Sequence, residues 1–206
     1  SELPKSAEIL ERIYMEETAK FGVDNVALLS PYRQKTDTGV NALNERIRLQ
    51  INPPDAAKKE VVLGKRTFRV GDKVMQTKNR EDINNGDVGF ITEISGSGSE
   101  TVVKIDFGDG RMAEYDITEL GLLDLGYAST IHKSQGSEYQ SVIINLQCAH
   151  AIMLVRPLIY TAITRAKERV IIVGERRALC IAIKKQDTEE RGTLLAQRLI
   201  EFSDRK

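Results

Sequence analysis

The sequence predicts an α/β protein with three layers and a mainly parallel sheet, which is interrupted by a small β-barrel. In residues 1–64 and 123–206, apolar runs of strand length alternate with amphipathic helical segments, and this is typical of a parallel sheet covered by helices. Residues 65–122 instead contain short strand-like runs at close spacing and no helical pattern, which is typical of a small barrel. We therefore expect an α/β domain of residues 1–64 and 123–206 and an inserted barrel of residues 65–122.

The first part of the α/β domain is predicted to form a helix, a strand and a second helix. Ser6 is a plausible N-cap for the first helix, and Gly22 follows its last turn. Residues 26–30 are an apolar run of the buried-strand type. The second helix is expected over residues 40–50 and ends at Pro53-Pro54, because the residue before a proline avoids the helical region.

Four strand-like runs are predicted within the barrel. Turn sequences separate them, among them Asn84-Asn85-Gly86-Asp87 and Gly108-Asp109-Gly110. The runs cover residues 70–76, 88–94, 101–107 and 111–115. Basic residues gather in the first part of the barrel, where Asp72 is the acidic residue among Lys65, Arg66, Arg69, Lys73, Lys78 and Arg80. This charge permits contact with a nucleic-acid backbone, although solvated side chains are the simpler interpretation.

The α/β pattern returns after the barrel. Strands are expected over residues 142–146 and 169–174, and a helix over residues 158–167 precedes the second of them. Two further helices, over residues 178–185 and 193–202, are expected to follow it.

The composition is that of an ordinary globular protein, with 41% hydrophobic and 29% charged residues. No apolar run approaches the roughly 20 residues of a membrane span, and no secretory leader is visible. Cys148 and Cys180 lie far apart, so we expect neither a disulfide framework nor a metal site, and a cytoplasmic location. The net charge is zero, so nucleic-acid binding would depend on a local set of cations.

Residues 126–139 form one segment with possible chemistry. Ser129 or Thr130 can cap a short helix after a strand, and the exposed N–H groups at such a start bind phosphate. Lys133 adds a positive charge, and Gly136 lets the backbone approach a ligand. Loops at the carboxyl ends of parallel strands commonly bind ligands. A capped helix with a terminal glycine is an equally good interpretation of this segment alone.

Residues 157–170 form the second such segment. Small and polar residues alternate with apolar ones along one predicted helix, and Arg165 lies near its end, before a buried strand. Tyr160 and Ile163 are expected to anchor this helix on the sheet. An arginine on a rigid helix suits bidentate contact with phosphate, and a surface cation near a helix C-terminus is the alternative. His132 alone is more often a packed or solvated residue than a functional one, and His150 is interpreted as structural.

Taken together, these segments resemble a known family. Thr130 to Glu138 resembles motif V of superfamily 1 helicases, and Tyr160 to Ala166 resembles their motif VI. Ser30 to Gln34 is similar to the motif at the start of their second motor domain. Residues 39–44, followed by Asn52-Pro53, are close to RecD-type helicases in particular, which also carry a barrel between these motifs. Over nearly its whole length the chain therefore resembles the C-terminal region of a RecD-type superfamily 1 DNA helicase, or exodeoxyribonuclease V alpha subunit, with a second RecA-like motor domain and an inserted SH3-like barrel.

The resemblance implies that the chain is the C-terminal half of a motor. In such helicases, two RecA-like domains bind one ATP between them, and the first domain carries the phosphate loop and the ligands of Mg²⁺. The 206 residues contain no G-x-x-x-x-G-K-[ST] sequence. ATP and Mg²⁺ would thus be held mainly by the N-terminal RecA-like domain of the same protein, and the chain alone would have no ATPase activity.

The resemblance also implies roles for individual residues. Arg165 would be the catalytic arginine finger. ATP would be bound by Gln135, Gly136, Glu138 and Arg165. Single-stranded DNA would be bound by Thr130, His132, Lys133 and Arg33.

The function implied is an ATP-dependent DNA helicase of DNA repair and recombination, similar to the group that moves 5′ to 3′. One alternative is a subunit of a RecBCD-type exonuclease, with RecB-like and RecC-like partners. The other is a degenerate RecA-like scaffold that binds nucleic acid without ATPase activity. Gln135, Gly136, Glu138 and Arg165 argue against the scaffold, which does not need to sense a nucleotide.

Overall fold

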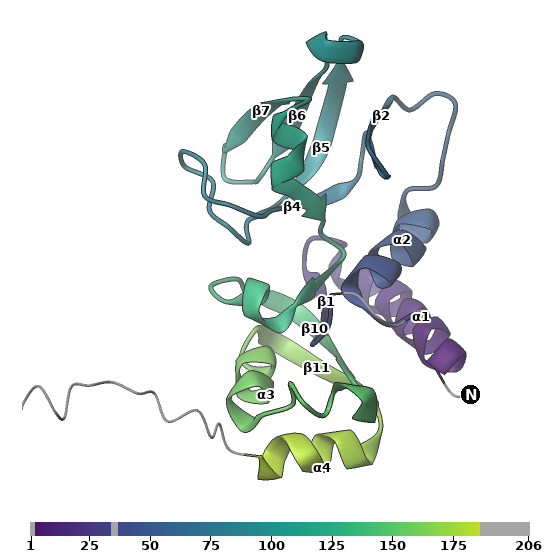
Figure 1. Ribbon diagram of the computed structural model, residues 1–206, viewed down its shortest axis with the longest axis vertical. Helices are drawn as coiled ribbons and strands as arrows, with labels where there is room; N and C mark the ends of the chain where they lie inside the picture. Colours follow the sequence, from purple (N-terminus) through teal and green to yellow (C-terminus); the bar gives the residue numbers. More distant parts are fainter. Residues whose placement is uncertain (1–2, 34–36, 186–206) are drawn as a thin grey trace, which may run out of the picture.

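The computed structural model describes residues 3–33 and 37–185, in two parts that lie one above the other (Figure 1). The lower part is an α/β domain built from both ends of the described chain, and the upper part is an antiparallel barrel built from its middle. The helix predicted for residues 193–202 lies outside the described residues.

The α/β domain is built on a four-stranded sheet in which all neighbouring strands are parallel. The apolar run of β1 (Val26–Ser30) is buried along its whole length, as expected for a strand covered on both faces. This confirms the predicted parallel sheet. Its order is β11 (Ala166–Gly174), β10 (Tyr139–Leu146), β1 and β9 (Ala128–Thr130).

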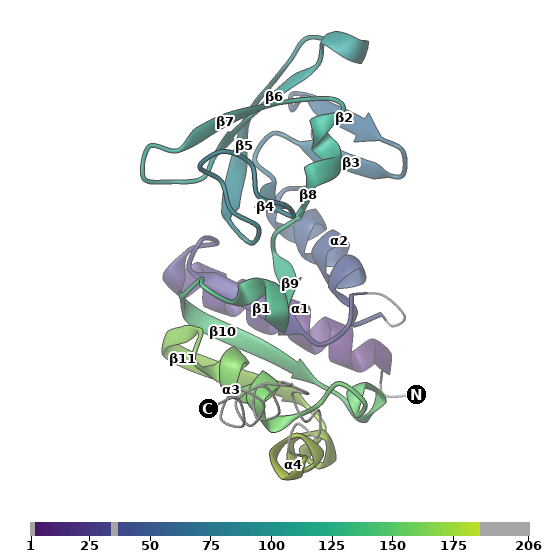
Figure 2. The ribbon, with the colours of Figure 1, turned by 60° about the vertical axis from the view of Figure 1, so that its left-hand side comes forward.

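Helices cover both faces of this sheet, as Figure 2 shows. Side chains alternate along a strand, so Leu28 packs with α1 (Leu3–Phe21) and α2 (Val40–Ile51) on one face. Leu29 packs on the other face with α3 (Arg156–Ile163) and α4 (Arg176–Lys184). The three predicted layers are therefore present.

The barrel consists of a five-stranded antiparallel sheet and a two-stranded hairpin. The sheet order is β7 (Met112–Asp116), β6 (Val102–Asp106), β5 (Val88–Ser95), β4 (Lys73–Gln76) and β8 (Leu123–Leu125). The hairpin joins β2 (Glu60–Leu63) to β3 (Arg66–Arg69). The predicted turn before β5 is present, and Gly86 adopts the φ of +100° that a glycine tolerates there.

The strand pairing of the barrel extends beyond residues 65–122 at both ends. Val61 of β2 packs in the same apolar cluster as Val74 and Ile91, and β8 pairs with β4 as far as Leu125. Residues 60–125 thus form one antiparallel unit. The division of the chain into domains stays a prediction.

Two predicted helix ends were wrong. The first helix begins at Leu3 rather than after Ser6, because Pro4 fits a first turn, where its missing N–H has no intrahelical partner. The helix predicted to reach Lys167 ends at Ile163, because the chain from Ala166 onward pairs with β10.

Buried polar groups join the barrel to the α/β domain. Lys73 of β4 is fully buried, and its Nζ donates to the carbonyls of Val23, at 2.6 Å, and Val26, at 3.1 Å. The neighbouring Asp72 carboxylate is also buried and accepts from the Asn52 amide, which follows α2, at 2.8 Å. Burial lowers the pKa of Lys73 to about 7, so the junction contains an amine that titrates near neutral pH.

A variant that lacks residues 60–125, with Lys59 joined to Gly126 by a flexible Gly/Ser linker, is expected to keep one cooperative unfolding transition, because inserted modules usually fold as separate units. Its free energy of unfolding should fall by about 1 to 2 kcal/mol, since buried groups of the α/β domain lose the partners that Asp72 and Lys73 provide. Urea denaturation followed by circular dichroism measures both quantities. Loss of the cooperative transition would show that the α/β domain requires the barrel.

Candidate functional site

The structure gathers the predicted site residues in two places. One is the loop before β10, together with the turn before β11. The other is a cavity between the α/β domain and the barrel. The first place contains Gln135, Gly136, Glu138 and Arg165.

Arg165 lies in the turn between α3 and β11, and three hydrogen bonds hold its guanidinium. Its Nη1 donates to the Ser137 carbonyl at 3.2 Å, and its Nε donates to the Thr161 carbonyl at 3.2 Å. Its Nη2 donates to Thr164 Oγ1 at 3.3 Å. The guanidinium therefore links the loop before β10 to the end of α3.

The anchoring of α3 differs from the prediction, in which Tyr160 and Ile163 pack on the sheet. Tyr160 is 69% exposed and Ile163 is 40% exposed. The face of α3 that packs on the sheet instead carries Leu158, Ile159 and Ala162. Because α3 ends before Arg165, hydrogen bonds rather than a helix fix the position of the guanidinium.

The loop before β10 is open to solvent. Gln135, Gly136 and Glu138 are exposed, and Gly136 has a φ of +91° with no other group near the place of a β-carbon. Glu138 forms an ion pair with Lys167 at 3.4 Å. The Glu138 side chain and the Gly136 backbone are therefore accessible to a ligand.

This loop lies at the amino ends of its strands. The Tyr139 N–H, at the start of β10, donates to the Arg165 carbonyl, just before β11, at 2.9 Å. The predicted segment thus starts at the carboxyl end of β9, where Thr130 pairs with Ser30 of β1. Gln135, Gly136 and Glu138 lie at its other end, just before β10.

The predicted capped helix is a single turn of 3₁₀ helix, η3 (Ile131–Ser134). Thr130 occupies its N-cap but makes no side-chain capping hydrogen bond. The turn carries the chain from β9 back to β10, and buried Ile131 packs with the α3 side of the sheet. The expected side-chain cap is therefore absent, and the phosphate site at this helix start stays a prediction.

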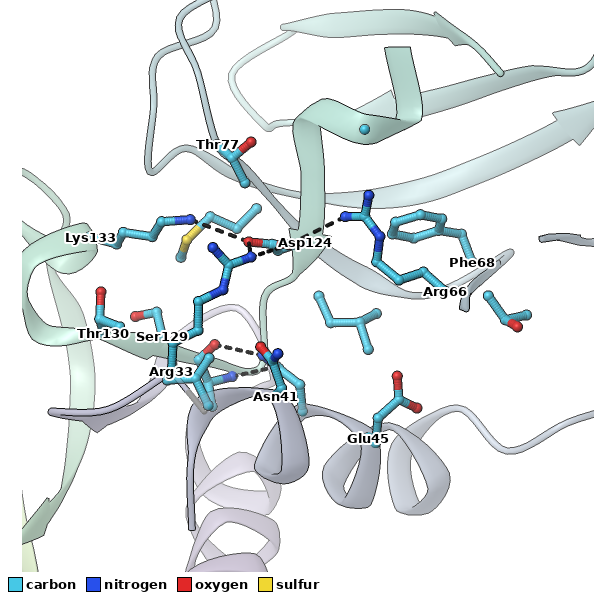
Figure 3. Close-up of a pocket in the computed structure, with 17 residues that line it drawn as sticks. Arg33, Asn41, Glu45, Arg66, Phe68, Thr77, Asp124, Ser129, Thr130 and Lys133 are labelled. Atoms are coloured by element: carbon cyan, nitrogen blue, oxygen red, sulfur yellow. Dashed lines mark hydrogen bonds and ion pairs between the residues drawn. The ribbon is translucent and has the colours of Figure 1, made fainter. Parts of the chain in front are cut away.

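The second place is a cavity of about 470 Å³ between the α/β domain and the barrel. Arg33, Thr130 and Lys133 line it from the α/β domain (Figure 3). Three of the four residues predicted to bind DNA therefore meet there. His132 is exposed and does not line this cavity.

The sequence analysis missed two charged site residues on the barrel side of the cavity. Arg66 of β3 and Asp124 of β8 line its barrel side. Arg33 Nη2 donates to the Asp124 carboxylate at 2.7 and 2.9 Å. Arg66 was visible only as part of the basic cluster, and Asp124 carried no signal, because its partner Arg33 is 91 residues away in the sequence.

His150 is fully buried, and its Nδ1 accepts from the Gln147 N–H at 3.3 Å. Its ring meets that of Tyr32 edge-on, with 5.2 Å between the ring centroids. Burial lowers the pKa of His150. These contacts are those of a packed, neutral side chain.

Two kinds of feature are absent from the described residues. No group of three or more His, Cys, Asp or Glu side chains in this part of the chain is placed to hold a metal ion. None of the helices within residues 3–33 and 37–185 has the length and apolar character needed to cross a membrane.

Two segments of the chain match different family models. Residues 43–107 match the SH3 domain of ATP-dependent RecD-like DNA helicases. Residues 125–173 match the C-terminal domain of UvrD-like helicases. The UvrD-like match thus covers β9, β10, nearly all of β11 and the loop around Arg165, and the SH3 match covers most of α2 and the strands β2 to β6.

Two curated RecD proteins are similar in sequence to this chain. The chain is 38% identical over 180 residues to the ATP-dependent RecD2 DNA helicase of Deinococcus radiodurans, covering 86% of this chain and 24% of that protein. It is 36% identical over 136 residues to the RecBCD enzyme subunit RecD of Mycolicibacterium smegmatis, covering 65% of this chain and 23% of that protein. Among solved structures, Pif1 helicase from Candida albicans is similar with a TM-score of 0.48 at 16% identity, covering 84% of this chain and 49% of that one.

The fold and the sequence matches together define the C-terminal domain of a superfamily 1 helicase. The chain belongs to the RecD-like helicases, as a C-terminal region with its SH3 domain. It spans about a quarter of the length of the curated relatives named above.

Proposed function

We propose that the chain is the second motor domain of an ATP-dependent DNA helicase, which binds ATP and Mg²⁺ together with a first RecA-like domain and moves along single-stranded DNA. The observation that best supports this is the linkage of Arg165 to the loop before β10, which joins the two helicase-like motifs at one exposed place. Residues 1–64 and 123–206 would form the motor domain. The inserted SH3-like barrel, predicted as residues 65–122, would guide the strand.

The nucleotide would contact the exposed loop before β10. Arg165 donates at 3.2 to 3.3 Å to neutral oxygens, whereas charge-assisted hydrogen bonds are commonly about 2.7–2.9 Å. A phosphate oxygen would therefore be a stronger acceptor than the present ones. Gln135, Gly136 and Glu138 would line the same cleft. The first motor domain would supply the phosphate loop and the Mg²⁺ ligands, and Arg165 would stabilise the charge that develops on the transferred phosphoryl group.

The DNA strand would pass the cavity beside η3 and the end of β1. Arg33 and Lys133 would contact its phosphates, and Thr130 would lie beside them. His132 would face the strand from the exposed side of η3. Such contacts depend strongly on salt, so binding by this chain alone should be weak above low ionic strength.

A second candidate keeps the same chemistry within a larger assembly. The similarity to a RecBCD enzyme subunit RecD supports a subunit that works with RecB-like and RecC-like partners. Co-purification with such partners, or its absence, separates this candidate from a free-standing helicase.

The 206-residue chain alone is expected to show no DNA-stimulated ATP hydrolysis, because phosphoryl transfer depends on a phosphate loop and Mg²⁺ ligands that its sequence does not contain. The same chain joined to a RecA-like first domain should hydrolyse ATP in the presence of single-stranded DNA. A phosphate-release assay compares the two, with a substitution of the phosphate-loop lysine as the control. Hydrolysis by the isolated chain, above that control, would contradict the proposal.

A further inference from the structure

Three cations from three separate elements converge on one carboxylate (Figure 3). Arg33 follows β1, Lys133 lies in η3, and Arg66 lies in β3 of the barrel. All three form ion pairs with Asp124 of β8, at 2.7 Å from Arg33, 3.4 Å from Arg66 and 3.3 Å from Lys133. The cations thus come from both sides of the cavity.

The cavity has an excess of positive charge. Among the described residues that line it, the acids are Asp124 and Glu45. The charge of Glu45 is balanced by another residue, because its carboxylate forms an ion pair with Arg48 at 2.6 Å. Three cations therefore face one carboxylate, which leaves an excess of two positive charges.

Asp124 lies at unequal distances from its three cationic partners. The distance to Arg33 is that of a charge-assisted hydrogen bond, whereas those to Arg66 and Lys133 are about 0.5 Å longer than such bonds usually are. Asp124 pairs with Met75 across β8 and β4, so the backbone holds the carboxylate at this place. Arg66 Nη1 also donates to the Leu123 carbonyl at 2.7 Å, but this acceptor is neutral. The positive charges of Arg66 and Lys133 are therefore only partly balanced and can attract a further anion.

We propose that Arg33, Arg66 and Lys133 form a phosphate site and that Asp124 is its internal counter-ion. A backbone phosphate of single-stranded nucleic acid replaces the Asp124 carboxylate as the partner of Arg66 and Lys133. The carboxylate competes with the strand for these cations. It therefore keeps the affinity of this domain for the strand low, so that the strand can dissociate. The inference rests on the proposed function, where Arg33 and Lys133 contact DNA, and it adds Arg66 and Asp124.

The test measures binding of a fluorescent oligothymidylate to the 206-residue chain by anisotropy at several salt concentrations. Asp124→Asn should raise the affinity about threefold to tenfold at low salt, because a competing charge is removed. The slope of log K against log salt should become steeper by about 0.7, the value for one more phosphate contact on a single strand. Glu114→Gln is the matched control: it changes the net charge equally but lies on β7, outside the cavity.

Arg66→Gln provides an independent variant. It should weaken binding and make the salt slope shallower by a similar amount, and its effect should be larger in the Asp124→Asn background than in the wild type. Competition with inorganic phosphate and with ATP identifies the source of the anion. Insensitivity of all forms to millimolar phosphate and ATP supports a strand phosphate, whereas displacement at much lower concentration from Asp124→Asn supports the same site with a free phosphate as its ligand.

Two results would overturn the inference in different ways. Unchanged or weaker oligonucleotide binding by folded Asp124→Asn would mean that the carboxylate orders the three cations rather than competing with DNA, and the proposed motor would be unaffected. Failure of every form to bind oligonucleotide would contradict the DNA track itself and the inference with it.

Discussion

Replacement of Arg165 by alanine, in a helicase that contains this chain, should lower the rate of ATP hydrolysis by about 10³- to 10⁵-fold, the effect of removing an arginine finger. Unwinding should be lost with it. Nucleotide affinity should change little, since the phosphate loop of the other domain supplies most of it. Arg165→Lys should restore little activity, because an ammonium cannot reproduce the planar guanidinium fork. Steady-state ATPase assays and equilibrium nucleotide binding measure the two effects separately.

The matched control for this prediction is Arg176→Ala, because Arg176 is an exposed arginine at the start of α4. Arg169 lies nearer but is unsuitable, since it pairs with the buried carboxylate of Glu17 at 3.4 Å. Loss of the Arg165 hydrogen bonds should cost only about 1 kcal/mol of stability, so a thermal melt excludes unfolding as the cause. Equal turnover of the two alanine variants would show that Arg165 is a local tether and not a catalytic residue.

The second large effect concerns pH and Lys73. The free energy of unfolding should rise by up to about 2.7 kcal/mol between pH 7 and pH 9, at most about 1.36 kcal/mol per pH unit for one proton. Below pH 7 the amine is protonated in both states, because its pKa is about 7 in the folded protein. Above pH 7 and below its ordinary pKa of 10.5, the unfolded chain binds a proton that the native state has released, so stability increases with pH.

The groups around Lys73 set the limits of the pH range in which stability rises. The charge of Asp24 raises the pKa of the amine and opposes the effect of burial, and the ring of Tyr139 lies 5.9 Å from Nζ. The Tyr127 hydroxyl accepts from the Lys73 N–H at 3.2 Å. Burial raises the pKa of both tyrosines, so ionisation of unfolded tyrosines should lower the stability above about pH 10.

Lys73→Met should remove the rise between pH 7 and pH 9, as measured by urea denaturation at each pH. Lys104→Met is the control. The hydrogen bond with Glu93 raises the pKa of Lys104, which is only partly exposed, so this amine stays protonated in both states over the same range. A rise that persists in Lys73→Met would assign the titration to another group.

The sheet and its layers could be predicted because their signal is local. The run from Val26 to Ser30 is apolar at every position except its last residue, and a strand buried on both faces needs such a run. Helix ends were less predictable, since propensity alone does not show where pairing with another strand begins. The chain leaves the helical pattern at Thr164 because Ala166 pairs with Tyr139, which is distant in the sequence.

The candidate site was predictable only in part. Arg33, Thr130 and Lys133 belong to recognisable motifs, and the structure brings them to one cavity. The counter-ion Asp124 and the barrel cation Arg66 join them through contacts between segments far apart in the chain. Such contacts depend on how the barrel sits on the α/β domain, which no spacing within the sequence specifies.

The passage from β8 to β9 has a mechanical consequence. Gly126 is the residue between Leu125 and Tyr127, and its N–H donates to the Lys73 carbonyl at 2.8 Å. A β-carbon at Gly126 would lie 3.0 Å from the backbone of Val74. The two backbone segments are therefore in contact where the barrel meets the parallel sheet. We therefore expect β9 and the barrel to move together as one rigid unit, because a shift of either would break this contact.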